Sequence, residues 1–242
     1  MSEILAGVNS VTEALKGRRK IHKIYIQNGR QDKRIDRIID SAQAKGVYIQ
    51  YLDKEKLNKM CKANNHQGVI ALVDTYTYAS IDQILNIAAS RGEQPFVLIL
   101  DGIEDPHNLG SIIRTAECAG VHGIIIPKHN SAAITEGTVR ASAGAVEHIS
   151  IARETNLVNA IKALKDRGLW VVGTDMTSSH TLFSTKIPTP AALVIGGEGK
   201  GMRRLVKDNC DLIISIPLFG RINSLNASVA AGLLIYEIIR QR

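Results

Sequence analysis

The stretch FVLILDGIEDPHNLGSIIRTAECAG, residues 96–120, sets the architecture of the larger part of this chain. It begins with the apolar run FVLIL, and a polar loop and a helical pattern follow. A continuous apolar run predicts a strand buried on both faces, as in a parallel sheet that helices cover. The stretch therefore predicts one strand–loop–helix unit of an α/β fold.

Further apolar runs continue this rhythm toward the C-terminus. They are GIIIP (123–127), GLWVVGTD (168–175), AALVIGGE (191–198) and LIISIP (212–217). Helical patterns fill most of the gaps, for example at 156–167 and 224–240. Strands that alternate with helices predict a parallel sheet, whose ligands bind in loops at the carboxyl ends of the strands.

The composition of the 242 residues excludes several classes of protein. No apolar run reaches the length of about 18 residues that a membrane span needs, and no signal peptide is visible at the N-terminus. Three scattered cysteines argue against disulfides and against a Cys-rich zinc site. The seven histidines form no metal-ligand spacing, so we expect no metal. A reducing, cytoplasmic location fits best.

The positive charge is concentrated in the first third of the chain. Residues 1–80 carry a net charge of +6, whereas residues 81–242 carry +1. Strand-like and helical patterns within the first 73 residues predict a small α/β domain. We expect a basic RNA-binding domain at 1–75, a linker with one amphipathic helix at 76–94, and the parallel-sheet domain at 95–242. A basic domain indicates a polyanionic partner, most often nucleic acid; the alternative is a solvated basic surface.

Within the basic domain, the segment KGRRKIHK (16–23) could bind phosphates or form a solvated loop. Likewise His66 and Gln67 could contact RNA or serve the structure. Aromatic residues make up 4% of the chain, which favours recognition of folded RNA by shape and backbone over stacking on single strands.

Three loops rich in Gly, Asn and Ser follow predicted strands, at 101–120, 196–202 and 217–232. Because carboxyl ends of parallel strands share one edge of the sheet, these loops are expected to converge on a site. Three ordinary turns are the alternative, since Gly and Asn favour turns. Neither the dinucleotide-binding nor the P-loop glycine pattern is present in the required strand and helix context.

Taken together, the three loops resemble the SpoU, or TrmH-like, branch of the SPOUT RNA methyltransferases. Asn108, Gly110 and Arg114 form N-x-G-x-x-x-R, LVIGGEGKGM (193–202) centres on Glu198, and IPLFGRINSLNASVA (216–230) carries S-L-N at 224–226. The resemblance extends to HQGVIA (66–71) and is greatest to the bacterial enzymes that methylate guanosine in 23S rRNA.

This resemblance implies a SPOUT domain with a deep trefoil knot, S-adenosylmethionine as methyl donor, and a homodimer with the site close to the subunit interface. The implied reaction transfers a methyl group to the ribose 2′-hydroxyl of a guanosine in 23S rRNA. Two alternatives stay open: a tRNA 2′-O-ribose methyltransferase, and a non-catalytic RNA-binding factor in ribosome assembly.

The resemblance also implies roles for individual residues. The expected catalytic residues are Asn108, Arg114, Glu198, Ser224 and Asn226. The expected cofactor-binding residues, acting largely through their backbone, are Gly196, Gly197, Ile216, Leu218 and Leu225. At 218 the family commonly has Met, and Leu is a swap that conserves volume.

Each catalytic candidate has a structural alternative. Arg114 is the family's candidate for activating the hydroxyl, but a guanidinium pKa above about 12 makes it a better phosphate clamp than a base. The structural alternative for Arg114 is a surface salt bridge. Asn108 is expected to fix Arg114 or the substrate; its alternative is an Asx turn or a helix cap after Pro106. Glu198 is expected to position Arg114 or the loops; its alternative is a solvated turn carboxylate. Ser224 suits a helix N-cap, and Asn226 a local backbone hydrogen bond.

Overall fold

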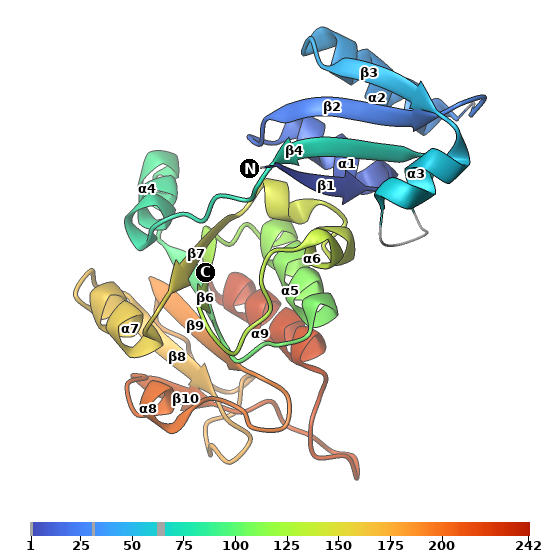
Figure 1. Cartoon of the computed structure of the whole chain (residues 1–242). Coiled ribbons are helices and arrows are strands. Elements are labelled where there is room, and N and C mark those ends of the chain that lie inside the picture. Colours follow the sequence, from blue (N-terminus) through green and yellow to red (C-terminus); the bar gives the residue numbers. More distant parts are fainter. Residues whose placement is uncertain (1, 31, 62–65) are drawn as a thin grey trace. The chain divides into compact units, whose positions relative to one another are not determined.

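The computed structural model describes residues 2–30, 32–61 and 66–242. The chain divides into two compact units (Figure 1). Unit 1 holds the residues up to Thr77 together with Ile134–His148, and unit 2 holds Tyr78–Ala133 and Ile149–Arg242.

Unit 1 is a four-stranded sheet with helices. Its elements are β1 (Ser2–Ala6), α1 (Val8–Lys16), β2 (Ile21–Gln27), α2 (Lys33–Ala44), β3 (Tyr48–Leu52), α3 (Lys54–Met60), β4 (Val69–Asp74), α6 (Glu136–Ala141) and the 3₁₀ helix η1 (Ala145–Glu147). The strand order is β1-β4-β2-β3, with β2 and β3 parallel and the other pairs antiparallel. The small α/β architecture expected from the strand-like and helical patterns is confirmed. The short strand β1 was not anticipated, because five residues at the sheet edge give little periodic signal.

The segment 134–148 enters unit 1 from the middle of the sequence. Its helix α6 packs against β1 and α1. The guanidinium group of Arg19 forms ion pairs with Glu3 and with Glu147, whose side chain is 2% exposed. Because this return is made by tertiary contacts, local sequence patterns do not reveal it.

Unit 2 is an α/β unit built on a parallel sheet, as expected, and the sheet has six strands. Its elements are α4 (Ile81–Arg91), β5 (Phe96–Asp101), α5 (Pro106–Cys118), β6 (Gly123–Pro127), β7 (Ser150–Glu154), α7 (Leu157–Lys165), β8 (Trp170–Thr174), β9 (Ala191–Gly196), α8 (Arg204–Lys207), β10 (Leu212–Ile214) and α9 (Ala227–Gln241). The strand order is β10-β8-β9-β5-β6-β7. The sequence did not suggest β7, because SIARE is short and half polar. The trefoil knot stays a prediction.

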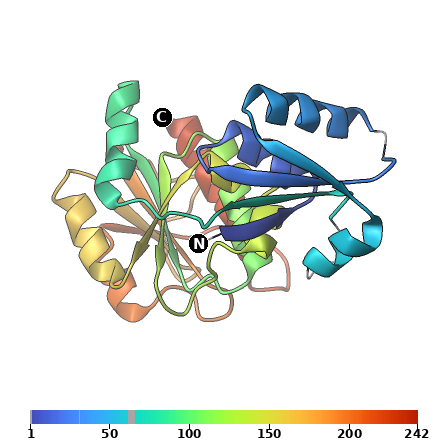
Figure 2. The same cartoon turned by 45° about the horizontal axis from the view of Figure 1, so that its top comes forward.

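Helices cover both faces of the unit 2 sheet (Figures 1 and 2). Residues of α4, α7 and α8 pack on one face against Val97 and Ile99 of β5. On the other side α5 packs against α9, and α9 contacts β9. Ile84 of α4, within the expected linker, is fully buried in this core.

The strand order places the site. The chain runs outward from β5 through β6 to β7, whereas β9, β8 and β10 lie on the other side of β5. Asp101 at the end of β5 pairs with Gly196 at the end of β9. Loops that leave these two neighbouring strands in different directions create a crevice of the kind in which α/β sheets bind ligands.

Candidate active site

Three side chains from the three predicted loops form one hydrogen-bonded cluster. Asn108 Nδ2 donates to Glu198 Oε1 over 2.9 Å, and Asn226 Nδ2 donates to the same oxygen over 2.9 Å. Asn226 Nδ2 also donates to Asn108 Oδ1 over 2.9 Å. The backbone N–H of Ala227 completes the set at 3.4 Å from Glu198 Oε1. Residues 90 and 118 positions apart in the chain are thus brought together at the end of the sheet.

Local capping interactions hold the two asparagines in place. Asp105, not Asn108, caps α5, since its side chain accepts from His107 N–H and Pro106 begins the helix. Asn108 is therefore free to reach Glu198, and it is 8% exposed. A helix start also favours the negative charge of Glu198, which lies against the first N–H of α9.

Asn226 is the N-cap of α9, so the structural alternative for Ser224, a helix N-cap, does not hold. The Asn226 Oδ1 atom accepts from the N–H groups of Ser228 at 3.0 Å and Val229 at 3.3 Å. Its Nδ2 atom is then directed toward Asn108 and Glu198. The helix begins at Ala227, so Ser224 lies in the exposed loop before the cap. The catalytic role of Ser224 stays a prediction.

Arg114 lies apart from this cluster. It is exposed on α5 and, among the described residues, forms no hydrogen bond or ion pair. At about 100° per residue, the six positions from Asn108 to Arg114 turn its side chain about 120° around the helix. Within one chain, Glu198 therefore holds Asn108 and Asn226 together rather than positioning Arg114.

The expected cofactor loops combine tight turns with a free backbone. A Cβ atom on Gly196 would lie 2.3 Å from the carbonyl carbon of Gly201, and one on Gly197 would lie 2.1 Å from the Gly102 oxygen. The backbone of this loop therefore requires Gly196, and the backbone of the neighbouring loop after β5 requires Gly197. Between 216 and 225, the backbone makes no hydrogen bond to another described residue.

Two leucines of that loop also leave apolar surface uncovered. Leu218 is 36% exposed and Leu225 is 38% exposed. Together with Ile216, they give the loop both unpaired backbone groups and apolar side chains. Such a loop can bind a ligand that has polar edges and an apolar face.

A cleft with a volume of about 600 Å³ opens on the β5 and β6 side of the cluster. Asp101, 1% exposed, lies at its edge and accepts two bonds of 2.7 Å from the N–H and the Nε of Arg203. The side chains that line the cleft include Glu104, Asn108, Asn130, Glu198 and Lys200. Of the five expected cofactor residues, Gly197 alone lines it.

In unit 1, His66 and Gln67 support the structure. His66 is 3% exposed; its Nδ1 accepts from Gly68 N–H over 2.9 Å, and its Nε2 lies 2.8 Å from Asn58 Oδ1. Gln67 Oε1 accepts from Val8 N–H over 3.1 Å, at the start of α1. Burial of His66, with Lys54 and Arg30 nearby, lowers its pKa from the ordinary value of 6.5.

The basic segment 16–23 divides into internal and outward-facing charges. Arg19 is committed to Glu3 and Glu147, and its side chain is 7% exposed. Lys23 lies 4.9 Å from the centre of the Tyr48 ring. Arg18 and Lys20 are exposed and have no ion pair within the described residues. They are the members of the segment best placed to meet a polyanion.

Two features are absent from the described part of the chain. No helix there has both the length and the apolar character that crossing a membrane requires. Nor do three or more His, Cys, Asp or Glu side chains gather there in a way that could hold a metal ion.

Comparison with known families accounts for most of the chain. Residues 95–236 match the SpoU rRNA Methylase family. Residues 4–79 match the family described as RNA 2′-O ribose methyltransferase substrate binding. The resemblance drawn from the three loops is therefore confirmed over the whole span that carries them.

Similar proteins cover almost the full length of the chain. YacO of Bacillus subtilis, named as a TrmH family tRNA/rRNA methyltransferase, is 47% identical over 240 residues, which are 99% of this chain and 96% of YacO. A relative from Staphylococcus haemolyticus, also named as a TrmH family methyltransferase, is 44% identical with the same coverage.

Solved structures share the architecture. An rRNA methyltransferase from Sinorhizobium meliloti, crystallised with AdoMet, matches with a TM-score of 0.81 and 26% identity, covering 99% of this chain and 87% of that chain. The SpoU methyltransferase AviRb from Streptomyces viridochromogenes matches with a TM-score of 0.81 and 24% identity, covering 99% and 90%. The latter likeness concerns the fold alone.

Proposed function

The chain belongs to the SpoU family of RNA methyltransferases, and we propose that it transfers a methyl group from S-adenosylmethionine to the ribose 2′-hydroxyl of a guanosine in 23S rRNA. The observation that carries this proposal is the cluster in which Glu198 Oε1 accepts from both Asn108 and Asn226. This cluster joins all three motif loops at the carboxyl edge of the sheet, where α/β folds bind their ligands. A methyl transfer needs two ligands there, the methyl donor and the RNA.

The residues of the 196–225 region fit the proposed cofactor. Unpaired backbone groups from 216 to 225 can bond the polar edges of an adenosine, and Leu218 and Leu225 can cover its apolar surface. When bound, S-adenosylmethionine supplies a methyl group on a positively charged sulfonium. The protein must then orient the acceptor oxygen and hold it close to that methyl group.

The cluster supplies this orientation. Asn108, Glu198 and Asn226 fix one another, so none of them must be ordered at the moment of reaction. Glu198 Oε2 has no partner among the described residues, so it can accept a hydrogen bond from the acceptor ribose. Ser224 is exposed and lies two residues before Asn226 in the chain. We propose that it orients the reacting groups together with the cluster.

Arg114 is proposed to clamp the phosphate of the target nucleotide. A planar guanidinium binds two phosphate oxygens at once and stays protonated, so it lowers the pKa of the neighbouring hydroxyl without acting as a base. A phosphate oxygen or a water molecule then takes the proton. Because Arg114 points away from its own chain's Asn108, we propose that it serves the site of a second copy.

An exposed apolar stripe on α9 supports such a homodimer. Val229, Leu233 and Tyr236, at helical spacing on this helix, are 53%, 41% and 53% exposed. The stripe lies on the helix that packs against α5, which carries Arg114. Two copies that join through this face would bury the stripe and bring Arg114 near the partner site.

Unit 1 is proposed to bind the RNA. The net charge of +6 on residues 1–80 suits a phosphate backbone, and the family matched by residues 4–79 is a substrate-binding one. An enzyme of rRNA would act in the cytoplasm, where we place this protein.

Methylation assays on two inactive variants test the proposal that Arg114 serves the site of a second copy. Arg114→Ala and Glu198→Ala should each abolish methyl transfer to rRNA isolated from cells that lack the protein. When the two are mixed and allowed to exchange subunits, half of the dimers carry one complete site, so about a quarter of wild-type activity should return. No recovery would place Arg114 in the site of its own chain.

The nucleoside that acquires the methyl group separates the alternatives. Digestion of the product and mass spectrometry should give 2′-O-methylguanosine from 23S rRNA. Methylation confined to tRNA would favour the tRNA enzyme. Absence of both methylation and S-adenosylmethionine binding would favour a non-catalytic assembly factor.

A further inference from the structure

Two regions of unit 2 adjoin the cluster around Glu198. The loop after β10 carries the proposed cofactor residues Ile216, Leu218 and Leu225. The cleft is lined by loops that follow β5, β6 and β9, and none of those three residues lines it. Since Glu198 and Asn108 also line this cleft, a group placed in it lies against the proposed catalytic cluster.

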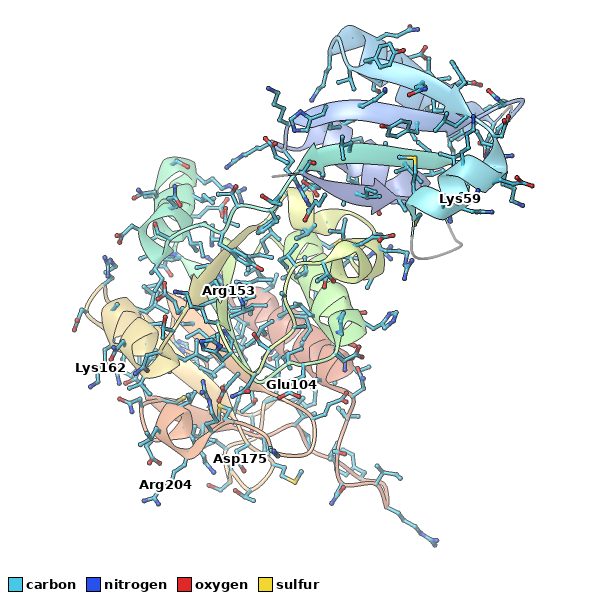
Figure 3. All side chains as sticks on the ribbon, viewed as in Figure 1. Lys59, Glu104, Arg153, Lys162, Asp175 and Arg204 are labelled. Carbon is cyan, nitrogen blue, oxygen red and sulfur yellow. The ribbon has the colours of Figure 1, made fainter. Side chains whose placement is uncertain are left out.

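One of the carboxylates that line the cleft is uncommitted. Asp101 is bound to Arg203, Asp105 caps α5, and Glu198 holds the two asparagines. Glu104 is exposed and, among the described residues, forms no hydrogen bond or ion pair. Figure 3 shows it on the loop between β5 and α5.

We propose that this cleft receives the base of the acceptor nucleotide, and that Glu104 selects guanine. The inference rests on the ribose methylation proposed above. Two adjacent N–H donors, N1–H and the N2 amino group, lie on the Watson–Crick edge of guanine, and the two oxygens of one carboxylate accept both. The corresponding edges of adenine and cytosine pair a donor with an acceptor, and that of uracil places its donor between two carbonyl oxygens.

The loop after β9 contributes a positive charge to the cleft. Lys200 is exposed, lines the cleft, and forms no ion pair within the described residues. A lysine there can meet a phosphate next to the bound nucleotide, while Glu104 meets the base. The cleft thus offers separate contacts for the backbone and for the base, and of these two contacts the one with Glu104 distinguishes one base from another.

Substituting the base and the carboxylate together tests the proposal. The substrates are synthetic RNA fragments that carry the methylated position, identified by mass spectrometry, as either guanosine or inosine, which lacks the N2 amino group. Wild-type enzyme should show a kcat/KM about 10- to 100-fold lower on the inosine fragment. Glu104→Gln should lower kcat/KM on guanosine by a similar factor, and inosine should then add little further loss.

S-Adenosylmethionine binding and a matched variant separate this role from a general defect. Glu104→Gln should bind S-adenosylmethionine with wild-type affinity, measured by calorimetry. Glu117→Gln, on α5 outside the cleft, should methylate guanosine at the wild-type rate. Equal turnover of guanosine and inosine by the wild-type enzyme would overturn the proposal without reference to any variant. A wild-type enzyme that methylates no ribose would instead overturn the proposed function itself.

Discussion

The side-chain amide of Asn226 lies 2.9 Å from Glu198 Oε1, so one hydrogen bond ties the first residue before α9 to the loop that follows β9. The same oxygen accepts from Asn108 on α5. A single carboxylate atom thereby connects three segments that the chain order keeps far apart. The arrangement makes Glu198 a positioning residue for both asparagines, and its removal should release them together.

Glu198→Ala should lower the rate of methyl transfer by at least about 100-fold, because misplacing reacting groups by an ångström has effects of that size. Its melting temperature should stay close to that of wild type, since the side chain is exposed. Glu198→Gln, which keeps one oxygen acceptor, should lose less activity than Glu198→Ala. Single-turnover rates and thermal melts give both readouts. A rate near wild type in Glu198→Ala would show that the cluster is not part of the reacting site.

Gly196→Ala should impair both folding and cofactor binding. The added Cβ would lie 2.3 Å from backbone atoms of Gly201 and Met202, so the loop that carries Glu198 must shift. We expect a lower melting temperature and a loss of S-adenosylmethionine affinity in calorimetry. Gly232→Ala, on α9 outside these loops, is the control, because a Cβ there meets only the Thr115 side chain, at an ordinary contact distance of 3.9 Å. Unchanged affinity in Gly196→Ala would place the cofactor away from this loop.

Arg19→Ala should lower the free energy of unfolding of unit 1, because it removes ion pairs within the unit rather than a contact with RNA. Its removal leaves Glu147, 2% exposed, as a buried charge, and breaking such a pair costs about 3–5 kcal/mol. Denaturant unfolding of the full chain should show this destabilisation.

Double substitution of the exposed Arg18 and Lys20 should leave the stability of the protein unchanged. It should reduce the slope of log affinity for rRNA against log salt concentration by about 0.7–0.9 for each phosphate that the protein no longer neutralises.

If the Arg18 and Lys20 variant binds rRNA with the wild-type slope across a salt titration, these side chains do not contact phosphates. If Arg19→Ala melts like the wild type, its ion pairs with Glu3 and Glu147 contribute nothing. The two outcomes are independent, because one concerns the folded unit and the other its partner.

The strands of unit 2 other than β7 were predictable because each is a continuous apolar run, and their shared carboxyl edge predicted that the motif loops converge. The lateral order of the strands was not, since it depends on contacts that local patterns do not encode. The same reason hid the return of 134–148 to unit 1. At the start of α9, Ser224 and Asn226 are both good caps two residues apart, and only the position of Glu198 and Asn108 decides between them.

Residue His66 should make unit 1 sensitive to mild acid. In its neutral form, Nδ1 accepts from Gly68 N–H and Nε2 can donate to Asn58 Oδ1, so both ring nitrogens are paired. Protonation of Nδ1 breaks the first of these bonds. Burial, with Lys54 and Arg30 nearby, lowers the folded-state pKa below 6.5. The unfolded chain therefore binds more protons near that pH, and stability present above pH 6.5 is lost as the pH falls below it.

The melting temperature of the full chain should accordingly fall between about pH 7.5 and 5.5, the range in which histidines titrate. His66→Gln should be less stable at the upper pH but should lose less on acidification. Part of the dependence should remain, because burial also lowers the pKa of His122 in unit 2. An identical acid response in His66→Gln and wild type would mean that this histidine does not couple protonation to folding.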